Sequence, residues 1–263
     1  MTRFRPALGH LAATVLIVAA TAVPMLVLTV GALSRQWFFP QVLPRSLALT
    51  ETRRVLTDRQ TIHGLRDGVI VGIVVTALAV AAAWPTARVL ARAPARWRIG
   101  AFALLFLPSV IPPVGLAIGI DVVLLRAHLD GHVASVALAH LVPTLPYPAG
   151  VLTAAFRRYD QRIDDQAALL GAHPWQRFRL VTFPLLRPGL AVAAAFAFLV
   201  SWSQYLLTLL TGSGHVITIT MLLYNALSGG NPTVIGTLAL VAAGPTVVLL
   251  AVTGHHLAEV NRR

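Results

Sequence analysis

Residues 160–188 read DQRIDDQAALLGAHPWQRFRLVTFPLLRP and form the longest polar interruption in the second half of a very apolar chain. Ile163, Ala167 and Leu170 recur at i, i+4 and i+7, a spacing that places all three on one face of a helix. This pattern is too regular for a simple connector between two apolar segments. We therefore expect a short amphipathic helix at the start of the stretch.

The same stretch carries signals that end one helix and begin another. Asp164 and Asp165 are placed in the first helical turn, where carboxylates suit the positive end of the helix dipole. Gly171 ends the helix, because glycine takes up a left-handed conformation without a Cβ penalty. Pro174 has a fixed φ that fits the first turn of a second helix, which is predicted to end near Pro184.

The composition places the chain in a membrane. Of its 263 residues 57% are hydrophobic and only 11% are charged, whereas soluble domains carry about 25% charged residues. A spanning helix needs roughly 20 apolar residues, so the sequence predicts an all-α integral membrane protein with a single transmembrane domain over residues 1–263. The six predicted spans cover approximately residues 10–33, 68–88, 99–125, 133–155, 189–211 and 233–254, and a polar loop covers 157–188.

The missing residue types exclude several kinds of site. The chain has no Cys, so it can form neither a disulfide framework nor a thiolate metal site. Every basic residue is Arg and none is Lys, so the chain cannot carry the lysine-containing phosphate-binding loop of ATPases. Its histidines and acids match no metal spacing and no catalytic motif. We predict no metal, no cofactor and no enzyme activity in this chain.

The arginines set the predicted topology. The net charge of +12 comes from arginines at the ends of apolar segments, which is typical of membrane anchoring and not of nucleic-acid binding. With the N-terminus inside, most arginines lie in cytoplasmic segments and the outer segment 212–232 has no basic residue, so both termini and the loop 157–188 are assigned to the cytoplasm. The cytoplasmic arginines are Arg3, Arg5, Arg88, Arg92, Arg96, Arg98, Arg157, Arg158, Arg162, Arg177, Arg179, Arg187, Arg262 and Arg263.

Prolines and glycines inside the predicted spans indicate where helices pack. The prolines are Pro108, Pro112 and Pro113 in the third span and Pro143, Pro146 and Pro148 in the fourth. Because proline removes backbone hydrogen bonds that lipid cannot replace, these two helices are expected to line the interior of the bundle. The pairs Gly68/Gly72 and Gly115/Gly119 have small-xxx-small spacing, which favours close packing within the chain over a subunit interface.

Two sizeable segments are assigned to the outer side. The loop 34–67 contains an aromatic cluster at 37–39, which is interpreted as an interfacial belt, with a docking surface for an external partner as the alternative. The segment 212–232 shows turn chemistry in the glycine-rich TGSGHVIT at 211–218 and again in SGGNP at 228–232.

Few polar side chains lie within the predicted spans. Asp121 and His140 are each open to two interpretations, a group on a transport pathway or a structural partner. In the fifth span a dense set of hydrogen-bonding groups comprises Ser201, Trp202, Ser203, Gln204 and Tyr205. These five are candidates for a polar translocation path, and hydrogen bonding between helices is the alternative left open.

The opening stretch also resembles the signature of a known family, the permease subunit of type I ABC importers, which is the binding-protein-dependent inner membrane component. That family carries a cytoplasmic loop of the form EAA, three residues, Gly, nine residues and Ile-x-Leu-Pro. The matching residues in this sequence are Asp165, Gln166, Ala167, Gly171, Val181, Phe183 and Pro184. The spacing is kept throughout, and Gln166 is the largest departure.

The resemblance implies a MetI-like permease fold in the bacterial inner membrane and a coupling helix in the loop 157–188. Contact with a separate, dimeric ATP-binding subunit would then involve Asp165, Gln166, Ala167, Leu170, Gly171 and Pro184. The other implied partners are a second permease subunit, either a copy or a paralogue, and an external solute-binding protein.

The function implied is that of the permease subunit of an ATP-driven importer, which forms the path for a small hydrophilic solute. The segment SWSQYLLTLLTGSG at 201–214 is most similar to permeases for polyamines, thiamine and ferric ion, with the sugar branch next. The alternatives are an ion-coupled secondary transporter, which would need ionisable coupling groups or broken half-helices in related repeats, and another polytopic membrane protein such as an intramembrane enzyme.

Overall fold

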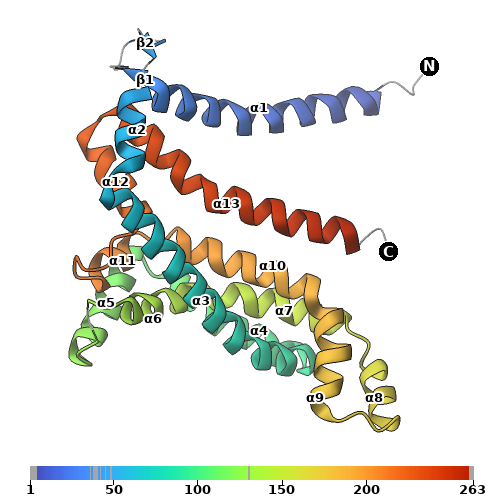
Figure 1. Ribbon diagram of the computed structural model, residues 1–263. Coiled ribbons are helices and arrows are strands. Elements are labelled where there is room, and N and C mark those ends of the chain that lie inside the picture. Colours follow the sequence, from blue (N-terminus) through green and yellow to red (C-terminus); the bar gives the residue numbers. More distant parts are fainter. Residues whose placement is uncertain are drawn as a thin grey trace. The chain divides into compact units, whose positions relative to one another are not determined.

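The computed structural model describes residues 5–35, 37, 41, 43–44, 46–47, 49–129 and 131–260, of which 5–12, 17 and 255–260 are described as backbone (Figure 1). Arg3, Phe38, Phe39, Arg262 and Arg263, which carried topology or belt predictions, lie outside these residues. The helices are α1 Arg5–Leu33, α2 Leu49–Thr57, α3 Arg59–Arg92, α4 Ala95–Val110, α5 Pro113–Arg126, α6 Val133–Thr144, α7 Pro146–Arg158, α8 Gln161–Leu169, α9 Pro174–Arg177, the π-helix η1 Phe178–Thr182, α10 Phe183–Trp202, α11 Leu206–Thr211, α12 Ile219–Gly229 and α13 Pro232–Val260. Two short strands, β1 Ser34–Arg35 and β2 Ser46–Leu47, pair antiparallel with Ser34 opposite Leu47.

The all-α prediction is confirmed, and the predicted spans fall into two kinds. Four stretches of the described chain are single helices long and apolar enough to cross a membrane, namely Ala13–Leu33, Arg59–Arg92, Pro174–Trp202 and Pro232–Gly254. Two more spans result if each of two bent helix pairs is counted as one, α4 with α5 and α6 with α7.

The third and fourth predicted spans are therefore not continuous helices. α4 and α5 are bent by 98° at Pro112, and α6 and α7 by 53° at Leu145. In both places a proline begins the following helix. Proline has no N–H, but the first N–H of a helix makes no intrahelical hydrogen bond, so none is lost there. The interior prediction holds for Pro146 and Pro148, which are fully buried, but not for α4, where no residue is buried within the chain.

The fifth predicted span, 189–211, also needs correction. Its helix starts earlier and ends at Trp202, and residues 203–205 separate it from α11. The second short helix of the 157–188 loop does not end near Pro184 either, because α9, η1 and α10 follow one another without a break. The π-helical turn bonds Phe183 N–H to the Phe178 carbonyl and carries the helix through the position where Pro184 provides no donor.

The chain divides into two compact units, and the first consists of residues 1–63 and 222–244. Here α13 approaches α1 very closely, since a Cβ on Gly236 would lie 2.6 Å from Ala32 N and 2.7 Å from Leu28 O. Thr233 Oγ1 donates to the carbonyl of Ser34 over 2.6 Å, and Asn231 Nδ2 donates to Glu51 Oε1 over 2.8 Å. Neither α2 nor α12 was predicted, because only loop and turn structure was assigned to these segments.

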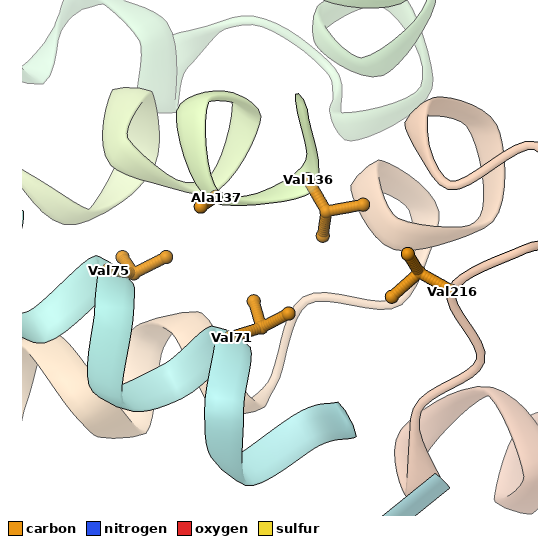
Figure 2. Packing of buried hydrophobic residues seen from close by; sticks show 5 residues of the cluster. All are labelled: Val71, Val75, Val136, Ala137 and Val216. Atoms are coloured by element: carbon orange, nitrogen blue, oxygen red, sulfur yellow. The ribbon is translucent and has the colours of Figure 1, made fainter. Parts of the chain in front are cut away.

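The second unit contains residues 64–221 and 245–263, and three apolar clusters hold it together. Figure 2 shows the first, in which Val71 and Val75 of α3 face Val136 and Ala137 of α6 and Val216 of the loop before α12. The second cluster joins α3, α7 and α10, and the third joins α5, α6 and α11. Each of these residues is nearly or fully buried, so the clusters fix the helices on which the polar groups described below are carried.

The two glycine pairs behave differently. Gly68 and Gly72 of α3 lie against α10, where a Cβ would meet Trp202 at 3.0 Å and Phe198 at 2.7 Å. This pair confirms the prediction of close packing within the chain. Gly115 has only Ile111 nearby, and around Gly119 there is open space, so the second pair makes no close helix contact within the described chain.

Candidate functional site

The 157–188 segment begins with a helix that is capped at both ends. Asp160 caps α8 by accepting a hydrogen bond from Arg162 N–H over 3.0 Å. At the other end Gly171 has φ +85, and the N–H groups of Gly171 and Ala172 bond the carbonyls of Ala168 and Ala167 over 3.0 Å. This is the Schellman arrangement, so the glycine elbow predicted from the sequence is confirmed.

A second short helix is held against the first. His173 and Gln176 form a capping box at the start of α9, in which Gln176 Oε1 accepts from His173 N–H over 2.9 Å. Asp164 of α8 is buried and lies 3.8 Å from Arg177 Nη1 of α9. The prediction for the two aspartates is thus partly wrong, because Asp164 turns inward to Arg177 and Asp165 lies exposed beyond the first turn.

An aromatic cluster connects the segment to the long helices. Phe178 of η1 stacks on Trp175 at 5.4 Å between ring centroids and meets Trp84 of α3 edge-on at 5.7 Å. Trp84 in turn meets Phe156 of α7 edge-on at 5.1 Å. Figure 1 shows α8 and α9 side by side where α7 ends and α10 begins. We name Trp84, Phe156, Trp175 and Phe178 the aromatic bridge, because their ring contacts connect α9 and η1 to α3 and α7.

The apolar face of this segment is exposed. Leu169 and Leu170 are 88% and 89% exposed, and Ile163 and Trp175 are also exposed. Of the other predicted coupling residues, Asp165, Gln166 and Pro184 are exposed and Ala167 is half-buried. Around Gly171 a Cβ would meet nothing within 4 Å, so its backbone conformation and not crowding requires glycine there. A braced loop with two fully exposed leucines has the properties of a docking surface.

The second candidate group, residues 201–205, lies where α10 ends and α11 begins. Ser201 and Trp202 are buried, whereas Ser203 is exposed and donates to the Val200 carbonyl over 2.9 Å. Trp202 stacks on Phe198, and its carbonyl accepts from Thr220 Oγ1 over 2.9 Å. Gln204 and Tyr205 are half-buried. The five side chains therefore do not line one surface together.

A buried polar network crosses this helix break. His140 of α6 is 1% exposed, with Nδ1 3.0 Å from Ser201 Oγ and Nε2 3.0 Å from Thr208 Oγ1. The Thr208 hydroxyl donates to the Gln204 carbonyl over 2.8 Å, so it accepts from Nε2–H, and Ser201 then donates to Nδ1. Neutral His140 with its proton on Nε2 therefore forms both hydrogen bonds, as donor to Thr208 and as acceptor from Ser201. We call His140, Ser201 and Thr208 the junction network.

Of the two open interpretations, His140 is a structural partner in this network. Asp121 is different, because its Oδ1 atom is buried and has no hydrogen-bond partner among the residues that the structure describes. Within that part of the chain it also makes no ion pair with Arg126, despite their proximity in sequence.

Three features of these sites were not predicted, namely Thr208, the Asp164–Arg177 pair and the aromatic bridge. The pair was detectable in principle, since Asp164 and Arg177 flank the predicted elbow with opposite charge. The bridge was not, because Trp84 and Phe156 come from distant helices and an aromatic residue in an apolar span is expected anyway.

Comparison with known proteins identifies relatives along most of the chain. A family model described as binding-protein-dependent transport system inner membrane component matches residues 77–256. A putative ABC transporter permease protein, ORF1 of Streptomyces antibioticus, is 28% identical over 212 residues, which cover 80% of this chain and 93% of the relative. PhnV of Salmonella typhimurium, a putative 2-aminoethylphosphonate transport system permease protein, is 26% identical over 250 residues, or 92% of this chain and 88% of the relative.

A solved structure supports the fold. The crystal structure of a bacterial ABC transporter involved in the import of the acidic polysaccharide alginate contains a chain that matches with a TM-score of 0.70. The match covers 97% of this chain and 98% of that one, at 14% sequence identity.

Proposed function

The chain belongs to the family of binding-protein-dependent transport system inner membrane components, the permease subunits of ABC importers, and from this premise we propose how it works. Its 157–188 segment docks in a separate ATP-binding subunit and passes the movement of that subunit to the membrane helices. The chain itself carries out no catalysis. Together with a second permease subunit it forms the path for a small hydrophilic solute that an external binding protein delivers.

The observation that carries this proposal is the exposed pair Leu169 and Leu170 on a braced loop. Burial of a leucine side chain stabilises by about 1.5–3 kcal/mol, so two leucines left in water strongly favour a protein partner. The ion pair from Asp164 and the cap at Gly171 hold α8 in place, which limits the entropy lost on docking. The aromatic bridge then supplies the mechanical connection from α9 to α3 and α7.

The path is proposed to run beside the junction of α10 and α11. The break at 203–205 leaves Gln204 and Tyr205 half-buried in otherwise apolar sequence, and irregular backbone at membrane depth is tolerated where it lines a cavity. In this proposal Ser201 and Trp202 support the path from behind, through His140 and Phe198. The proposed sidedness follows the arginines, with both termini and the 157–188 segment in the cytoplasm.

The solute is proposed only as a small hydrophilic molecule. The S. typhimurium relative is named for 2-aminoethylphosphonate, and the sequence of 201–214 resembles permeases for polyamines, thiamine and ferric ion. A thermal-shift screen of the cognate binding protein against these four and sugars would identify it, because the external protein largely sets selectivity.

The docking proposal is tested with the double variant Leu169→Asp/Leu170→Asp. Charges at the centre of an interface cost more than about 2 kcal/mol, so we expect co-purification of the ATP-binding subunit and ATP-driven uptake to fall at least about tenfold. The matched control is Leu43→Asp/Leu47→Asp, two exposed leucines in the predicted outer loop. Unchanged co-purification in the first double variant, at normal membrane insertion, would rule out this docking surface.

A further inference from the structure

A small cavity lined by arginines lies beside the aromatic bridge, where α3 and α7 end and α8 begins. Its volume is about 210 Å³. The lining residues are Arg88, Ala91, Arg92, Phe156, Arg157, Tyr159 and Gln161. We call it the arginine cavity. The family signature does not include its lining residues, and the leucine pair that carries the docking proposal is not among them.

The charge of the arginine cavity is not compensated by acidic side chains. None of its lining residues is Asp or Glu. In the described part of the chain the ion pairs are Arg66–Asp67 and Arg177–Asp164, so Arg88, Arg92 and Arg157 take part in neither. The nearest carboxylate along the chain, that of Asp160, caps α8 and lines a separate groove of about 640 Å³. Three arginines thus line one space that no acidic residue lines.

Two simpler roles explain part of this charge. Arginines near helix C-termini are favourable because of the helix dipole, and Arg92 and Arg157 lie in the last turns of α3 and α7. The C-termini of α3 and α7 each contribute roughly −0.5 charge. Together they offset about one of the three arginine charges, so a net charge of about +2 remains at the cavity. Arginines that only fix topology need to be on the correct side of the membrane, but they need not share a cavity.

The arrangement matches the chemistry of a phosphate group. Arg88 and Arg92 are one helical turn apart on α3, and Arg157 reaches the same space from α7, so cationic donors approach from two sides. A guanidinium group binds phosphate oxygens through two parallel hydrogen bonds. Gln161 adds neutral donors at the N-terminal turn of α8, and Phe156 forms an apolar wall. A liquid water takes up about 30 Å³, so the cavity has room for a phosphate.

We propose that the arginine cavity binds a phosphate group, supplied by the headgroup of an anionic phospholipid or by soluble phosphate. The lipid source is favoured by location, because α3 is a candidate membrane span and the cavity lies at its last turns. Basic pockets at the ends of spanning helices are suited to anionic headgroups. A bound lipid would join α3, α7 and α8 close to the aromatic bridge.

The test measures binding to the purified full-length chain by native mass spectrometry at fixed ionic strength. The probes are dioleoylphosphatidylglycerol, dioleoylglycerol, which has the same acyl chains without the phosphate, and inorganic phosphate. One arginine contributes about fivefold to the affinity for an anionic surface, so Arg157→Gln should weaken phospholipid binding about fivefold, and Arg88→Gln/Arg92→Gln/Arg157→Gln about a hundredfold. Dioleoylglycerol should bind weakly to all variants.

The control is Arg96→Gln/Arg162→Gln/Arg179→Gln, which removes the same charge from exposed positions outside the cavity. We expect it to change binding less than about twofold. If the glutamine triple variant does not fold, replacing the same three arginines by lysine keeps the charge but removes two-pronged binding, and should still weaken the complex.

The outcomes separate the sources. Loss of phosphatidylglycerol binding in the cavity variants supports the lipid source, and loss of inorganic phosphate binding alone supports a soluble source. The proposal is overturned if neither probe depends on the three arginines or if the control triple loses as much. It is also overturned if, in parallel co-purification assays, the only effect of the cavity variants is loss of the ATP-binding subunit, since the cavity would then be part of a protein interface.

Discussion

The 157–188 segment and the junction between α10 and α11 both depart from the usual placement of side chains, in which apolar groups are buried and polar groups are exposed. The segment presents Leu169 and Leu170 to the outside, whereas the junction places His140, Ser201 and Thr208 inside. The junction network is complete within the chain, since each of its polar atoms has a partner. The leucines have none. The comparison shows that the polar groups of the junction are satisfied within the chain, whereas the segment leaves two leucines exposed, as the proposed docking requires.

The largest effect is expected when the junction network is broken. His140→Leu removes the hydrogen bond of His140 to Ser201 and that to Thr208, and Thr208 keeps its bond to the Gln204 carbonyl. We expect the free energy of unfolding in detergent to fall by about 2–3 kcal/mol, because a buried hydroxyl remains unpaired. His63→Leu, at an exposed position, is the control. An equal loss in both variants would mean that the network does not stabilise the junction.

A smaller and local effect is expected in the segment. Asp164→Asn weakens the contact with Arg177 and should cost about 1–2 kcal/mol, seen as roughly tenfold lower protection of the amides of 161–177 in hydrogen exchange. Asp165→Asn is the matched control, since Asp165 is exposed and adjacent. Global unfolding should be unchanged by either variant. Equal protection in the two variants would show that the long ion pair does not brace α8.

The smallest effect concerns the elbow. Gly171 has φ +85 and open space around its Cα, so substitutions should rank by the backbone cost of the left-handed region, with Asn mildest, Ala intermediate at about 1 kcal/mol and Val worst. ATP-driven uptake should fall in the same order while membrane insertion stays normal. Normal uptake by Gly171→Val would contradict a requirement for this elbow.

What could be predicted from the sequence differs between the two regions. The helix–glycine–helix pattern of the 157–188 segment could be predicted, because its helix caps and its apolar spacing are determined by residues within about 20 positions of one another. The junction depends on contacts that no local pattern encodes. His140 lies 61 positions before Ser201 in the sequence and 68 positions before Thr208. SWSQY was recognised as polar, but its division between a buried and an exposed part was not.

The bent spans show the same limit. Pro112, Pro113 and Pro146 were recognised as disruptive, yet hydropathy alone joined the helices on either side into single spans. A bend of 98° is compatible with either a broken span or a re-entrant loop, and that choice is made by neighbouring helices and not by the residues at the bend. The five-residue π-helix could not be predicted either, since its sequence FRLVT also fits an α-helix.

The π-helical turn η1 determines the angle, around the helix axis, between the exposed face of α9 and the buried face of α10. An i→i−5 bond encloses one residue more than an α-helical bond, and each residue turns a helix by about 100°. The exposed face of α9 and the buried face of α10 are therefore offset around a single axis by one residue. Deleting one residue between Phe178 and Thr182 would leave both helices intact but rotate α9 by about a quarter turn relative to α10, so that Phe178 would point away from Trp84 of α3 while the core of α10 stayed in place.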